Sequence, residues 1–176
     1  IEKHKLKLQV NSTIVEAKPS YDDPREFAWF VSDTLFRFYN RDINPEEYLM
    51  FLYKYSSFSF QQEYLTGEYE EDLLFIKGIQ ELFSKREVKH ESYKISEIKY
   101  EQGQERGYFY RVITLDNPLN EYYISYIQLE NGIWKFASDQ PSPPFSITEE
   151  ILLPPNGTEE DYDEDLNTST NDWRKT

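Results

Sequence analysis

The sequence predicts an α+β fold in which N-terminal helices pack on one face of a curved antiparallel sheet. Apolar residues recur at helical spacing in three segments, which lie within residues 24–39, 45–56 and 68–84. From residue 88 onward the period changes to two, as in half-buried strands. Helices first and strands second indicate α+β rather than alternating βαβ units. The length of 176 residues suits one domain with a tail.

Two of the predicted helices carry start signals. Asp23 and Asn44 can each cap a helix, and each is followed by a proline at the first helical position. Glu26 and Glu47 stand three residues after these caps, as a capping box requires. The residues between 40 and 43 separate the two helices.

The third predicted helix, from about Glu68 to Ser84, has acids in its first turn and two basic residues after its end, in agreement with the helix dipole. We expect the core to include large apolar residues from the first helix and one from the last strand: Phe30, Leu35, Phe38 and Trp134.

Strand signals lie at both ends of the predicted domain. Alternating leucines and lysines before Val10 indicate a short strand or an extended arm, followed by a linker over 11–20. After the helices we expect strands at Val88–Tyr100, which is long enough to need a bend, at Tyr108–Leu115 and at Tyr122–Leu129. The pair Asn131-Gly132 predicts a tight type I′ hairpin leading into a strand over 133–137.

These signals divide the chain into four parts. An N-terminal arm and linker occupy residues 1–21, and the domain occupies residues 22–138. Residues 139–153 form a proline-rich linker with a short apolar segment that we expect to dock on the domain. Residues 154–176 form an acidic tail with the composition of a disordered segment.

The order of elements, with a closing strand that reads Gly132-Ile133-Trp134-Lys135-Phe136, resembles the NTF2-like (cystatin-like) superfamily. This resemblance covers roughly residues 22–137. It implies a cone-shaped domain with a pocket between the helices and the sheet. It implies no particular reaction, because the superfamily includes isomerases, dehydratases, transport factors and accessory domains without catalytic activity.

Composition excludes several function classes. A net charge of −14 opposes binding to nucleic acid or to anionic membranes. The absence of cysteine excludes disulfides, thiolate catalysis and cysteine-bound metals. No apolar run is long enough for a transmembrane span. The sequence begins at Ile1 rather than Met, so export or membrane association would depend on a segment removed before Ile1, and the compartment stays open.

Few residues suggest catalysis, and we expect neither a cofactor nor a metal. His90 is a weak candidate for a general base in the cone, and a position at a sheet edge or at the surface is the favoured interpretation. Arg111, the one charge between residues 108 and 115, could anchor a carboxylate ligand, but pairing with Glu121 or another acid across strands is favoured. In the tail, acids mimic calcium-loop spacing, yet Leu166 replaces the required glycine, so we expect a solvated acidic run: Asp161, Asp163, Asp165 and Asp172.

Both faces of the predicted sheet are apolar or aromatic, which is the most informative feature of the sequence. A sheet that is covered on one side should alternate apolar with polar residues. One face therefore needs a further cover, such as a protein partner, a second copy or residues 145–153. Two sets are candidates for the outer face: Tyr108, Tyr110, Tyr122 and Tyr126, or Phe109, Tyr123, Ile127 and Leu129.

These observations favour a non-catalytic binding or assembly module that uses its aromatic sheet face as a subunit or accessory domain of a protein complex. The partner would be a basic protein or a second copy of the chain. The alternative is a small-molecule enzyme or ligand carrier, of the isomerase or dehydratase kind, that uses the cone pocket.

Overall fold

The computed structural model describes residues 7–10, 13–144 and 151–154, with side-chain surroundings from residue 17 onward. Four helices precede the main sheet: α1 (Pro24–Tyr39), α2 (Pro45–Tyr55), α3 (Phe58–Tyr64) and α4 (Tyr69–Ser84). A five-stranded antiparallel sheet follows them: β3 (His90–Ile95), β4 (Lys99–Tyr100), β5 (Arg106–Leu115), β6 (Asn120–Glu130) and β7 (Ile133–Pro141). The predicted α+β class, with helices first, is confirmed.

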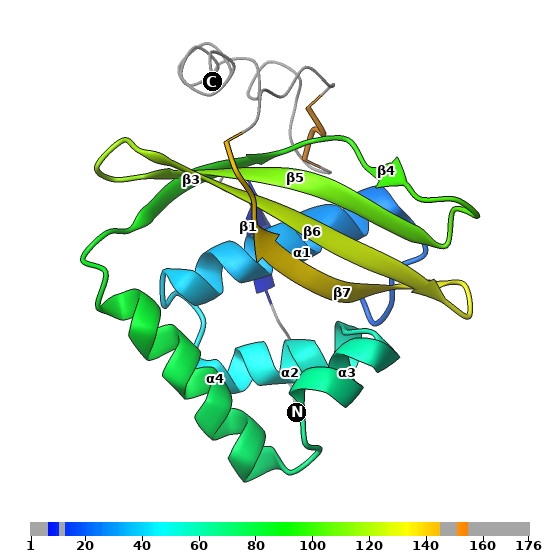
Figure 1. The fold of residues 1–176 in the computed structure, drawn as a ribbon, viewed down its shortest axis with the longest axis horizontal. Helices are drawn as coiled ribbons and strands as arrows, with labels where there is room; N and C mark the ends of the chain where they lie inside the picture. The colour runs from blue at the N-terminus through cyan, green and yellow to red at the C-terminus, as the bar shows by residue number, and fades with distance from the viewer. Residues whose placement is uncertain (1–6, 11–12, 145–150, 155–176) are drawn as a thin grey trace.

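The sheet is a meander. Its strands are ordered β3, β5, β6 and β7. The short strand β4 lies on the same side of β5 as β3 does, and pairs with the opposite end of β5, at Gly107 and Tyr108. Helices α2, α3 and α4 lie below the sheet, and α1 runs behind it (Figure 1). At the hairpin between β6 and β7, Asn131 and Gly132 have φ angles of 53° and 78°, as the predicted type I′ turn requires.

Two strand predictions need correction. The linker expected over residues 11–20 contains β2 (Thr13–Glu16), which pairs with β1 (Lys7–Val10) as a separate two-stranded sheet. The single strand expected from Val88 to Tyr100 is two strands, because the pairing with β5 is interrupted after Ile95. At the break, the Ser96 amide still donates to the Tyr110 carbonyl at 2.9 Å, so the chain turns without leaving the sheet.

The predicted helix starts are observed. The Asn44 side chain accepts a hydrogen bond from the Glu47 amide at 2.8 Å and the Glu47 carboxylate accepts one from the Asn44 amide, which completes the capping box. Asp23 caps α1 through the Arg25 amide, but Glu26 pairs with Lys18 instead of completing a box. Helix α3 was not predicted, since its seven residues show no apolar stripe that a periodicity search could find.

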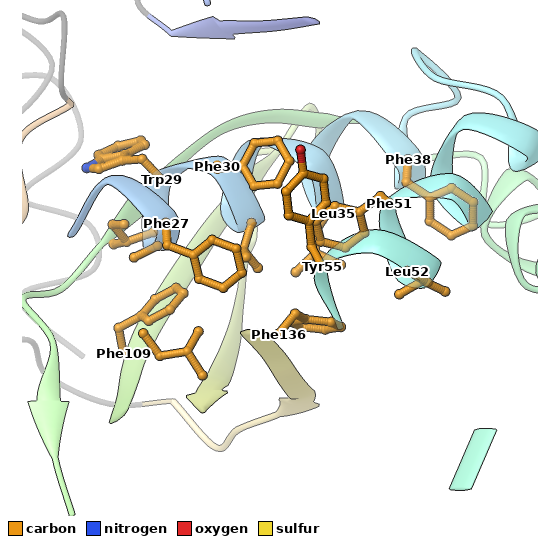
Figure 2. Packing of buried hydrophobic residues seen from close by; sticks show 14 of the residues in the cluster. Phe27, Trp29, Phe30, Leu35, Phe38, Phe51, Leu52, Tyr55, Phe109 and Phe136 are labelled. Atoms are coloured by element: carbon orange, nitrogen blue, oxygen red, sulfur yellow. The ribbon is translucent and has the colours of Figure 1, made fainter. Parts of the chain in front are cut away.

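The core is built from aromatic rings at the junction of α1, α2 and the inner sheet face. In Figure 2, Phe30 lies against Phe51 and Tyr55, and Phe136 of β7 approaches them from the sheet. The ring centroids of Phe30 and Tyr55 are 4.6 Å apart, and those of Phe38 and Tyr48 are 3.9 Å apart. All four residues expected in the core are buried: Phe30, Leu35, Phe38 and Trp134.

The segment after the domain is shorter than expected. Strand β7 continues through Asp139 to Pro141, so the linker expected from residue 139 begins within a strand. Ile151 and Leu152 are buried, and the Leu152 amide donates to the Ile95 carbonyl at 3.1 Å, so this apolar pair docks along the free edge of β3. Residues 145–150 and the acidic tail from residue 155, with its four spaced aspartates, lie outside the described residues.

Candidate functional site

A cavity of about 230 Å³ lies between the helices and the last strand. All four helices contribute to its wall, mainly with apolar and aromatic side chains, and β7 forms its floor with Phe136, Ser138 and Asp139. Tyr64 and Phe75 are half-exposed lining residues and mark the mouth between α3 and α4. The predicted cone therefore has an open side, and a carboxylate reaches its interior.

The carboxylate in the cavity wall is that of Asp139, and it forms a polar network with Arg111 and Ser125. The Arg111 guanidinium is 1% exposed and donates from Nη2 to Asp139 Oδ2 at 2.7 Å and from Nε to Ser125 Oγ at 3.0 Å. The Ser125 hydroxyl in turn donates to Asp139 Oδ1 at 2.6 Å. Each charge is thus neutralised, and both carboxylate oxygens accept a hydrogen bond. Asp139 could act as a general base only by giving up these contacts.

Arg111 therefore pairs with an acid two strands away rather than with Glu121. Glu121 binds Arg86 instead. The Arg111 guanidinium also lies 5.0 Å from the centre of the Tyr123 ring, a cation–π contact that covers one of its faces. An anchor for a ligand carboxylate needs an unneutralised cation, and Arg111 does not supply one in this arrangement.

Two tyrosines give the cavity hydroxyl groups that stay protonated. Burial raises the pKa of Tyr39 and of Tyr48, and the nearby negative charge of Asp139 raises both further. At neutral pH both groups are hydrogen-bond donors and not bases. The Ser138 Oγ atom is buried and has no hydrogen-bond partner among the described residues. The polar groups of the cavity are therefore suited to holding a neutral molecule or side chain.

His90 lies outside the cavity and is a poor base. Its side chain is buried between α1 and β3, with Phe36 and Tyr39 each at 6.0 Å from its ring. Burial lowers its pKa to about 4, although Glu121, with Oε1 at 3.7 Å from Nε2, acts in the opposite direction. The imidazole is neutral at physiological pH. His90 begins the edge strand β3, as the expectation of an edge histidine requires, but its side chain is 6% exposed and so does not lie at the surface.

The strand register places the four candidate interface tyrosines on one face. Tyr108 is opposite Tyr126, and Val112 is opposite Tyr122, on the face directed away from the helices. The alternative set points inward, where Phe109 and Ile127 are fully buried. Tyr108, Tyr110 and Tyr126 are half-buried, and the Tyr108 ring contacts the rings of the other two. Tyr122 is buried and offers little surface.

Comparison with protein-family models, curated proteins and solved structures gave no match. The NTF2-like resemblance therefore stays a prediction, and the arrangement of helices on an antiparallel sheet is compatible with it. Within the described residues, no group of three or more histidines and acids is gathered to hold a metal ion. None of the described helices is long and apolar enough to cross a membrane.

Two features of this site were missed from the sequence. Asp139 was assigned to the linker, although an arginine inside a buried strand requires an acid nearby, and this requirement could have directed attention to it. The cavity itself depends on the unpredicted helix α3, which contributes Phe60 and Tyr64 to the wall.

Proposed function

We propose that this protein is a non-catalytic binding domain that acts as a subunit or accessory domain of a protein complex. The observation that carries this proposal is the Arg111–Asp139–Ser125 network. Asp139 is the carboxylate among the described residues of the cavity wall, and both of its oxygens already accept hydrogen bonds within this network. A cavity whose described wall offers no acid free of such contacts is better suited to recognition than to proton transfer.

The contact surface in this proposal is the tyrosine face, defined as Tyr108, Tyr110 and Tyr126. The ring centroids of Tyr108 and Tyr126 are 5.7 Å apart, and the guanidinium of Arg106 lies 4.7 Å from the centre of the Tyr126 ring. Tyrosine and arginine are enriched in protein interfaces because they combine large contact area with a polar end. The two occupants that fit are a second copy of the chain and a basic protein.

Light scattering of the wild type and of the Tyr108→Ser, Tyr126→Ser double variant tests for the homodimer. A dimer held by apolar contact should persist when the ionic strength is raised, and the double variant should be monomeric. A complex with a basic partner should weaken with salt. Leu119→Ser, at an exposed apolar position in the turn between β5 and β6, is the matched control.

For a basic partner, the two variants and the wild type are used as baits in the source cell, and bound proteins are quantified by mass spectrometry. The proposal predicts at least one protein that the double variant loses and the control retains. A wild type that is monomeric at all salt concentrations, and that captures the same proteins as the double variant, would exclude the tyrosine face as an interface.

The second candidate is a carrier of a small neutral ligand, and the wall of the cavity, lined mainly by apolar and aromatic side chains, favours it. The cavity of about 230 Å³ is smaller than the roughly 300–1,000 Å³ of typical ligand sites, so the ligand would be no larger than a bicyclic aromatic compound. Titration with indole, followed by NMR, tests this candidate. Saturation at micromolar concentration, abolished by filling the cavity with Ile79→Trp, would support a carrier.

A further inference from the structure

Helix α4 exposes an apolar stripe along the side opposite its buried residues. Leu74 is 72% exposed and Leu82 is 66% exposed, whereas Leu73 and Ile76 of the same helix are buried. Together with Gly78 they recur at every fourth position and so lie in one row. Helix α4 packs on α1 and α2 through its other side and forms the outer boundary of the helix layer (Figure 1).

Gly78 is a second, independent observation at the centre of this row. A glycine inside a helix destabilises it relative to alanine. A Cβ atom at Gly78 would meet nothing within 4 Å, so the fold itself does not require this glycine. Because Gly78 has no side chain, the backbone of another helix could approach α4 closely at this point.

The row continues into the cavity. Phe75, next to Leu74, is half-exposed and lines the mouth, and Ile79, next to Gly78, lines the wall. A cavity of about 230 Å³ is below the size of typical small-molecule sites but suits one large apolar side chain. In protein interfaces such an anchor residue, set in a pocket at the centre of the contact, supplies much of the affinity.

The charge around the row selects the partner. The segment from α3 to the residues that follow α4, residues 58–86, has six acids and three bases: Glu63, Glu68, Glu70, Glu71, Asp72 and Glu81, against Lys77, Lys85 and Arg86. Asp72 is buried and Glu81 pairs with Lys85, so the negative charge that a partner would meet comes from the exposed acids Glu63, Glu68, Glu70 and Glu71. A second copy of this acidic chain would be repelled, as would an anionic membrane. A basic partner would be attracted and oriented.

We propose that the α4 row, formed by Leu74, Gly78 and Leu82, binds a basic amphipathic helix of a partner protein, whose aromatic anchor side chain enters the cavity between α3 and α4. The apolar face of that helix would cover the two leucines, its backbone would pass over Gly78, and its lysines or arginines would meet the acids beside the row. This surface lies on the helix side of the molecule and is separate from the tyrosine face.

The probe is a fluorescein-labelled peptide of about five helical turns, built from leucine and lysine at helical spacing with one central tryptophan. Its binding is measured by fluorescence anisotropy at low and high salt. We expect Leu74→Gln, Leu82→Gln and Gly78→Gln each to raise Kd at least tenfold. The matched control Leu119→Gln, at a position that is 63% exposed and belongs neither to the α4 row nor to the cavity wall, should leave Kd unchanged.

Changes in the peptide test the anchor and the charge. Replacement of its tryptophan by alanine should weaken binding at least tenfold, and replacement of its lysines by glutamate should abolish it. The Tyr108→Ser, Tyr126→Ser variant should bind as the wild type does, so that failure of the proposed tyrosine interface and failure of this proposal are distinguishable.

Three outcomes would overturn the proposal. The first is equal affinity for the wild type and the Gly78→Gln variant, and the second is equal affinity for the tryptophan and alanine peptides. The third is peptide binding at least tenfold tighter to a chain without residues 1–6, which would mean that the chain's own basic arm, and not a partner, takes this surface.

Discussion

Replacement of Arg111 by methionine should cost about 3–5 kcal/mol of unfolding free energy, because it leaves the Asp139 carboxylate buried without a counter-ion. Arg111 is 1% exposed, and the Asp139 side chain is 9% exposed, so solvent can replace little of the lost interaction. Methionine retains most of the apolar volume of the arginine stem. The expected loss is therefore electrostatic and not the result of a new cavity.

A double-variant cycle isolates this contribution. In Arg111→Met with Asp139→Asn the buried charge is gone, and the asparagine oxygen can still accept from the Ser125 hydroxyl. We expect the double variant to be clearly more stable than Arg111→Met alone, with a coupling of about 1–3 kcal/mol. Urea unfolding followed by circular dichroism measures each variant, and equal m-values confirm that the folded states are comparable.

Arg86→Met is the matched control. Arg86 pairs with Glu121 at a more exposed position, so its loss should cost about 1 kcal/mol or less. If Arg111→Met also cost less than about 1 kcal/mol, the network would be hydrated and dispensable. Asp139 would then be free for a ligand or for proton transfer, and the argument for a non-catalytic domain would fail.

Three further predictions follow from packing, burial and helix propensity. Phe38→Ala should cost about 3–5 kcal/mol in urea unfolding, because the ring is fully buried against Tyr48; a loss below about 1 kcal/mol would contradict this packing. The pKa of His90, lowered to about 4, should make stability fall as pH drops from about 6.5 to 4, since only the unfolded state takes up the proton there. At about 1.4 kcal/mol per pH unit the loss is up to about 3 kcal/mol, and His90→Gln should remove it from the pH profile. Gly78→Ala should raise stability by about 0.5–1 kcal/mol, measured in the same way, and a decrease would show that the fold requires the glycine.

The sequence alone determined the features that depend on neighbours along the chain. The caps at Asp23 and Asn44, the change of period after α4 and the Asn131-Gly132 turn are local devices, because each requires only residues three or four positions apart. Together with helical periodicity they established the α+β class and the order of its major elements. The short elements β2 and α3 could not be predicted, because they contain too few residues for a periodic pattern.

Only the tertiary structure decided the features that depend on register and on contacts across the chain. A shift of one residue in strand pairing exchanges the two faces of a sheet, so the alternation of aromatics could not show which set faces outward. The partner of Arg111 could not be chosen among 33 acids until β6 and β7 brought Asp139 to it. The cavity and the α4 row also depend on contacts between distant parts of the chain. Which apolar residues of a helix stay exposed is decided only when its other side packs on the neighbouring helices.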